Sequence, residues 1–141
     1  MAMTDMGKHL HISEKRVYIQ SLAYILKDKK EDFIKDYLLT QMAEYGIAES
    51  EYNSLSVVLD RTHLAKKLNK ISDIRTKRYI VREMILLAVA DHELNDQEID
   101  ELSQFGKDVG ICEEKMIDFF MWAARGIEWQ LDGTKLVEED L

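Results

Sequence analysis

The chain contains no proline, and its 141 residues include only six glycines. Proline and glycine interrupt regular structure, so their scarcity favours long helices and predicts an all-α fold. The single cysteine excludes a disulfide within the chain and any cysteine-rich zinc site. The longest apolar run, 84–90, is far shorter than the roughly 20 residues that cross a bilayer. The first dozen residues also lack the apolar stretch of a signal peptide, so we expect a cytoplasmic protein without a transmembrane segment.

The composition fits one folded domain, in which charge is distributed unevenly along the sequence. Hydrophobic residues make up 46% of the chain, and the net charge is −8. Residues 61–82 hold eight Lys or Arg and one acidic residue, whereas 83–141 hold sixteen acidic and four basic residues. The acidic total argues against a general nucleic-acid binder, while the basic stretch could contact phosphate, an anionic membrane or an acidic protein. We expect it mainly to be a solvated face that attracts the acidic remainder of the molecule.

The spacing of apolar residues predicts about seven helices. A first helix is expected after Ser13, and a long helix capped by Ser72 ends in the apolar run 84–90. Asn95 and Glu98 form a capping-box pattern that opens the next helix. Glycine followed by isoleucine is expected to stop two of the helices, and Gly126 a third. The other expected ranges are 31–45, 49–59, 62–68 and 113–125, followed by a weak turn of helix around Trp129.

A shift of the sequence by 64 residues reveals an internal similarity. Between 22 and 49, seven of 28 positions are identical to their shifted counterparts. Both copies contain an apolar helix, a charged corner, an amphipathic helix stopped by Gly-Ile, and a third helix. This predicts two similar helical units packed face to face. The expected organisation is a flexible N-terminus at 1–12, one helical domain at 13–131 with units at 15–59 and 73–126, and an acidic C-terminal tail at 132–141.

The acidic corner, residues 88–102, holds six carboxylates and no Lys or Arg. Asp91 follows the long apolar helix, where free carbonyl oxygens disfavour a carboxylate, and Glu98 falls in the first turn of the next helix. A tight corner would bring Asp91, Glu93 and Glu98 together as oxygen ligands for Ca²⁺ or Mg²⁺. The corner lacks the glycine and the final glutamate of an EF-hand loop. The alternative is that these acids only favour a helix start and a solvated face.

The segment LLAVADHELNDQEIDEL, followed by Gly-Ile and another helix, resembles the TerB-like (tellurite-resistance) family. The family signature runs from an apolar helix into Ala-x-x-Asp-Gly, with a Glu about seven residues after the Asp; Asp91 and Glu98 fit these positions. The resemblance covers about 15–126 and implies an all-helical, internally duplicated fold. It also implies a metal-binding, stress-associated or scaffold domain, with tellurite-type stress as one setting. His92 stands where the family has glycine.

The first unit departs further from the family pattern. The position equivalent to Asp91 is Lys27, and the nearest acids are Asp28, Glu31 and Asp32. If the family site takes acids from both units, these three are displaced substitutes.

Other functions follow from other features of the sequence. The second hypothesis is a protein-interaction module without metal, with a homo-oligomer as one form of it, which uses an aromatic helix around Phe119–Trp122 or the basic face. No nucleophile with a neighbouring base and no glycine-rich phosphate loop is evident, so we expect no enzyme, and a metal-dependent hydrolase is a third hypothesis. Cys112 is expected to be a small packing residue.

Overall fold

The computed structural model describes residues 10–90 and 94–138, and these residues form seven α-helices, one short 3-10 helix and no strand. The prediction of an all-α fold is therefore confirmed. The elements are α2 (Ile12–Ile25), α3 (Glu31–Glu44), η1 (Glu49–Glu51), α4 (Tyr52–Leu55), α5 (Arg61–Leu68), α6 (Ile74–Val89), α7 (Asp96–Asp108) and α8 (Glu113–Glu138).

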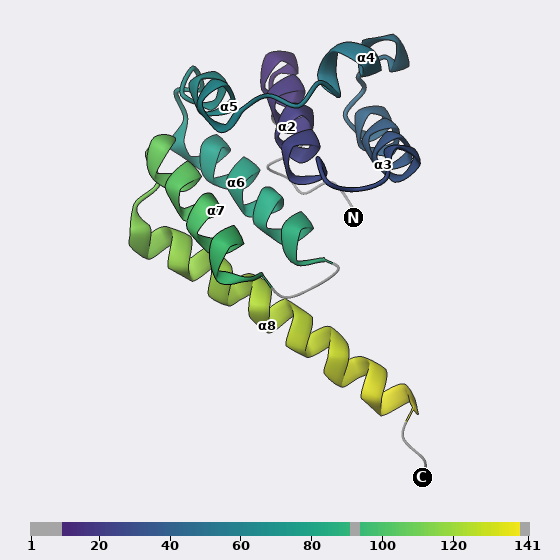
Figure 1. Ribbon diagram of the computed structural model, residues 1–141, viewed down its shortest axis with the longest axis vertical. Helices are drawn as coiled ribbons and strands as arrows, with labels where there is room; N and C mark the ends of the chain where they lie inside the picture. Colours follow the sequence, from purple (N-terminus) through teal and green to yellow (C-terminus); the bar gives the residue numbers. More distant parts are fainter. Residues whose placement is uncertain (1–9, 91–93, 139–141) are drawn as a thin grey trace.

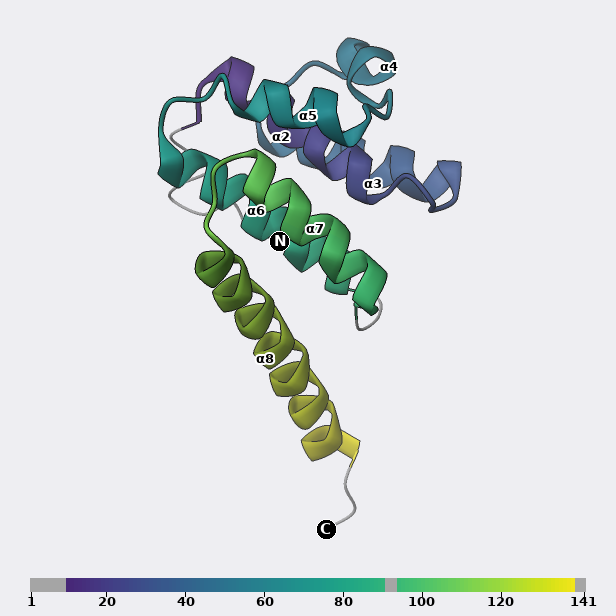
Figure 2. The same ribbon diagram turned by 60° about the vertical axis from the view of Figure 1, so that its left-hand side comes forward.

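Helices α2 and α6 pack against each other at the centre of the bundle (Figures 1 and 2). Helix α2 also contacts α3 and α5, while α6 contacts α8 on its other side. Helix α7 bridges α5 and α8. The N-terminal half of α8 lies against the body, and its C-terminal half projects beyond the other helices (Figures 1 and 2). One helix therefore has both a packed half and an unpacked half.

A continuous apolar core joins these helices. The apolar end of α6 was predicted to be central, and Met84 and Ile85 are indeed fully buried, although Leu86–Ala88 are only half-buried. The largest fully buried side chains are Tyr18, Ile19, Leu22, Leu26, Leu38, Met42, Leu64, Leu68, Ile80, Met84, Ile85 and Phe105.

Two helices end through the same backbone device. Gly46 follows α3 with φ 72°, and Gly110 follows α7 with φ 85°, in the left-handed region that favours glycine. The N–H of Ile47 donates to the Met42 carbonyl at 2.9 Å, and the N–H of Ile111 donates to the carbonyl five residues earlier at 2.8 Å. Both isoleucines are buried, as expected for this helix-ending motif. The predicted Gly-Ile stops are therefore confirmed.

Two predicted helix starts are displaced by one or two residues. Helix α2 begins before Ser13, and the carboxylate of Glu14 accepts a hydrogen bond from the His11 N–H at 2.9 Å. Helix α6 is capped by Asp73 rather than Ser72, because the Asp73 carboxylate accepts from the N–H two residues ahead at 2.9 Å. An ionised carboxylate is a stronger acceptor than a hydroxyl and also matches the positive end of the helix dipole.

The predicted end of the last helix at Gly126 was wrong. Helix α8 continues through Gly126, the expected weak turn at Trp129 and most of the expected tail, and ends at Glu138. Glycine inside a helix costs only roughly 0.5–1 kcal/mol relative to alanine, so it ends a helix only when a left-handed cap forms. Gly126 has no positive φ, and Ile127 after it is only half-buried.

Two smaller predictions also failed. The predicted helix over 49–59 is limited to η1 and α4 and ends at Leu55, before the exposed β-branched pair Val57 and Val58. Cys112 is exposed just before α8 rather than buried as a packing residue.

Candidate functional site

Of the three predicted metal ligands, Asp91 and Glu93 lie outside the described residues, and Glu98 lies in the first turn of α7. The Glu98 carboxylate accepts a hydrogen bond from the Asn95 N–H at 3.2 Å. The Glu98 N–H in turn donates to the Asn95 side-chain oxygen at 2.8 Å. This is the predicted capping box, so Glu98 has a structural role at the start of α7.

A hollow of about 210 Å³ lies where the acidic corner meets the turn between α2 and α3. Three carboxylates line it: Glu98 and Glu101 from α7, and Asp28 from the turn. The fold therefore brings one of the three displaced acids of the first unit, Asp28, to the corner. Glu31, also considered as a substitute ligand, lies at the start of α3 and is not among the residues of this lining.

Glu101, in this hollow, contacts two side chains of the first unit. The Tyr24 hydroxyl donates a hydrogen bond to its carboxylate, and the Lys27 ammonium lies 3.2 Å from the same oxygen. These contacts hold the pKa of Glu101 below its usual value, the Tyr24 hydrogen bond having the largest effect. The Lys27 ammonium also lies 3.8 Å from the centroid of the Tyr24 ring. Glu101 was not among the predicted ligands, although Lys27 in place of the family acid was a signal of a charge pair there.

The charges of this hollow limit what it can bind. Lys27 and Lys29 line it together with Asp28, Glu98 and Glu101, which leaves a formal charge of −1. A divalent cation would therefore have to compete with two ammonium groups for the same carboxylates. Within residues 10–90 and 94–138, no group of three or more His, Cys, Asp or Glu side chains is placed to hold a metal ion. The metal site at Asp91, Glu93 and Glu98 stays a prediction.

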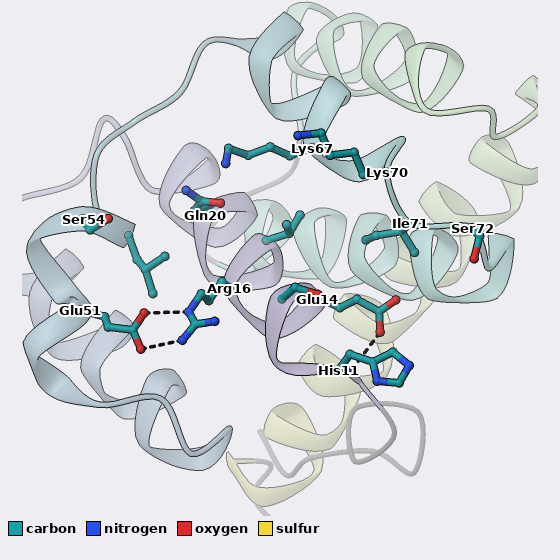
Figure 3. Close-up of a pocket in the computed structure, with 13 residues that line it drawn as sticks. His11, Glu14, Arg16, Gln20, Glu51, Ser54, Lys67, Lys70, Ile71 and Ser72 are labelled. Atoms are coloured by element: carbon teal, nitrogen blue, oxygen red, sulfur yellow. Dashed lines mark hydrogen bonds and ion pairs between the residues drawn. The ribbon is translucent and has the colours of Figure 1, made fainter.

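A second, polar hollow of about 570 Å³ lies between the start of α2, α4 and the loop after α5 (Figure 3). Arg16 donates to both oxygens of Glu51, at 2.7 and 3.2 Å, and this pairing lowers the pKa of Glu51. Lys67 and Lys70 also line this hollow. The bidentate pair joins α2 to η1 across 35 residues of sequence, so its evident role is to fix the position of these elements.

The projecting half of α8 carries large apolar side chains that nothing in the described structure covers. Trp129 is 78% exposed and Leu136 is 73% exposed. Helical spacing places Met121, Trp129 and Leu136 on one face, which is directed away from the buried Ala123. Single exposed apolar residues are common on protein surfaces, but several large ones on one helix face, here alternating with the charged Arg125 and Asp132, form a candidate contact surface.

The comparisons with known proteins add no relative. No protein-family model matches the chain, and no curated protein and no solved structure matches it. In the part of the chain that the structure describes, no helix is both long enough and apolar enough to cross a membrane.

Proposed function

We propose that this chain is a non-enzymatic, TerB-like helical domain that acts as a protein-interaction module and self-associates through α8. The observation that carries the proposal is the outer face of α8, which consists of Met121, Arg125, Trp129, Asp132 and Leu136. All five side chains are exposed. An apolar and aromatic face on a projecting helix is typical of helix-to-helix recognition.

The occupant we propose for this face is a second copy of the same chain. Two copies related by a twofold axis perpendicular to α8 place their α8 helices antiparallel. With the axis level with residues 128 and 129, Arg125 of each copy faces Asp132 of the other. Met121 then faces Leu136 in the same register. The face is thus complementary to itself in both charge and apolar contact, with Trp129 near the centre.

A charge-swap experiment tests this arrangement. Light scattering coupled to gel filtration should show a dimer for the native chain and a monomer for Arg125→Asp and for Asp132→Arg, since each change places like charges opposite each other in both contacts. The double variant Arg125→Asp/Asp132→Arg should recover the dimer. A native chain that is monomeric at about 0.1 mM, a concentration at which even weak dimers form, contradicts the proposal.

Trp129→Ala provides an independent test of the same face. Central aromatic residues contribute about 2 kcal/mol or more to many interfaces, and the dimer contains two copies of Trp129, so it should weaken by roughly thirtyfold or more. Because Trp129 is exposed, circular dichroism should show an unchanged fold. Lys107→Ala, on the exposed part of α7, is the matched control and should leave the dimer intact.

A divalent cation at the acidic corner is the second candidate function. What supports it is that Asp28 and Glu98, from the two halves of the chain, line one hollow. We propose weak Ca²⁺ or Mg²⁺ binding by Asp91, Glu93 and Glu98, as the TerB-like resemblance implies. Glu98→Gln separates this role from capping, because glutamine also closes a capping box but lacks the charge.

The expected result is a saturable calcium titration, followed by NMR, with shifts confined to residues 90–98 and to Asp28. Glu98→Gln and Asp91→Asn should each weaken that binding without loss of helix. No shift at millimolar calcium or magnesium would rule out the metal candidate and leave the α8 proposal unaffected.

The positions of the helices support the duplicated TerB-like architecture in this proposal. Shifted by 64 residues, α3 falls on 95–108 and α7 occupies Asp96–Asp108, while α2 falls on 76–89 within α6. The two glycine stops, Gly46 and Gly110, have the same separation. A cytoplasmic location and a role in stress response or as a scaffold belong to the same proposal.

A further inference from the structure

A third hollow, between α6 and α8, is lined by basic and aromatic side chains. It measures about 270 Å³ and no carboxylate lines it. On α6, Arg75, Arg78 and Arg82 follow one another at spacings of three and four residues and so lie on one helical face. The complete lining, here called the cationic hollow, is Arg75, Arg78, Tyr79, Arg82, Lys115 and Phe119.

Two of its four cations have a counter-charge nearby. The Arg75 guanidinium lies 3.4 Å from the Asp73 carboxylate, and Arg82 lies 3.5 Å from that of Glu83. Arg78 and Lys115 take part in none of the ion pairs formed among the described residues. Like charges gathered without a partner repel one another, so an anion bound among them would be stabilised.

The guanidinium groups also have unused hydrogen-bonding capacity. The Nε atom of Arg78 is buried and has no hydrogen-bond partner among the described residues, whereas the buried Nε atom of Arg82 faces the Glu83 carboxylate at 3.5 Å. A buried donor without a partner is unfavourable, and more so when it is charged. The Arg82 guanidinium is held in place by two rings, 5.3 Å from the centroid of Tyr79 and 5.5 Å from that of Trp122. These donors are therefore positioned before a ligand arrives.

The chemistry of the lining selects among anions. A guanidinium presents paired donors that match the oxygens of a phosphate group. A site with several cations attracts a dianion more strongly than a monoanion. Phe119 and Tyr79 supply apolar walls against which an attached ring can pack. We propose that the cationic hollow binds the phosphate group of a small soluble phosphate monoester, with Arg78, Arg82 and Lys115 as its ligands.

The test uses the full chain, with phenyl phosphate and inorganic phosphate as probes in NMR titrations. Phenyl phosphate should cause saturable shifts in 75–82 and 115–122, and inorganic phosphate should bind at the same place more weakly because it lacks the ring. Phenol, without the charge, should cause none. Shifts spread over all the basic residues of 61–82, or binding only to phosphatidic acid vesicles, would overturn the proposal.

Matched variants decide which cations act. Arg78→Gln and Lys115→Gln should each weaken phenyl phosphate binding by about tenfold, the effect of one lost charge-assisted hydrogen bond. Lys70→Gln, which removes a cation from the other side of the basic stretch, should leave it unchanged. Equal weakening in all three variants indicates general charge attraction and contradicts the site. Asp132→Arg, which should be monomeric, should still bind phenyl phosphate. The phosphate site and the α8 dimer are therefore tested independently.

Discussion

Glu83 is the acidic residue whose replacement should most clearly raise stability. It lies on α6 within the core and is only 3% exposed. Both carboxylate oxygens are buried without a hydrogen-bond partner among the described residues, and burial raises the pKa of the group. The nearby Tyr45 and Tyr79 hydroxyls hydrogen-bond to each other at 2.8 Å. Arg82, 3.5 Å away, partly offsets the charge.

The expected magnitude follows from that environment. A buried ion costs several kcal/mol in protein interiors, and replacing buried charged groups by apolar ones of similar size often stabilises by about 1–4 kcal/mol. Glu83→Met keeps the length of the side chain and removes the charge, so we expect a gain within this range at neutral pH. Arg82 is half-buried and retains solvent, so it should tolerate the loss of its partner. Glu83→Gln should gain less, because its amide also needs partners.

The direction of the Glu83 pKa shift determines how the stability difference should change with pH. Because the folded-state pKa of Glu83 is raised, the native protein holds this proton more tightly than the unfolded chain does. The destabilisation is absent below the unfolded pKa of about 4.3 and develops as pH rises through the folded pKa. The stability difference between Glu83→Met and the native chain should therefore grow from about pH 4 to neutral pH. Glu51, Asp60, Asp73 and Glu101 have lowered pKa values and act in the opposite sense, but they cancel in the difference.

Urea unfolding followed by far-ultraviolet circular dichroism measures this difference at several pH values. Equal slopes for the two proteins would show that the unfolded states are comparable. If Glu83→Met is less stable than the native chain at neutral pH, with Glu83→Gln equally destabilised, the Glu83 and Arg82 pair contributes more than its burial costs. That result would refute the expected gain in stability.

The remaining predictions concern helix packing and capping. Gly106→Ala should destabilise by about 1–2 kcal/mol despite its better helix propensity, because a Cβ there would lie 2.4 Å from the Met116 sulfur in the core. Gly126→Ala meets no atom within 4 Å and should stabilise by about 0.5–1 kcal/mol; the opposite order of these two changes in urea unfolding would contradict the packing described. Asn95→Ala should cost about 1 kcal/mol through loss of the α7 cap, and Asn95→Asp, which can still cap, should cost much less.

Sequence patterns predict features that depend on neighbouring residues. They do not predict features that depend on contacts between residues far apart in the chain. The capping box at Asn95 and the stops at Gly46 and Gly110 are local, and the structure confirms them. Gly126 is followed by isoleucine, as Gly46 and Gly110 are, but no left-handed cap forms there and α8 continues. The bond from Tyr24 to Glu101 spans 77 residues, and no local pattern announces it. The metal prediction depends on Asp91 and Glu93 and stays open.

In the folded chain, the basic side chains of 61–82 face two different surroundings, and the sequence alone does not show this. Arg61, at the start of the stretch, pairs with Asp108 at 3.4 Å, and Lys77, near its end, donates to the Val109 carbonyl at 3.5 Å. These contacts fit the expected attraction to the acidic half and join α5 and α6 to the end of α7. Helical periodicity turns Arg78 to another side, toward α8, where no carboxylate lines the hollow. Because α8 supplies only Lys115 and aromatic groups there, this part of the positive charge is left for a ligand from outside the molecule.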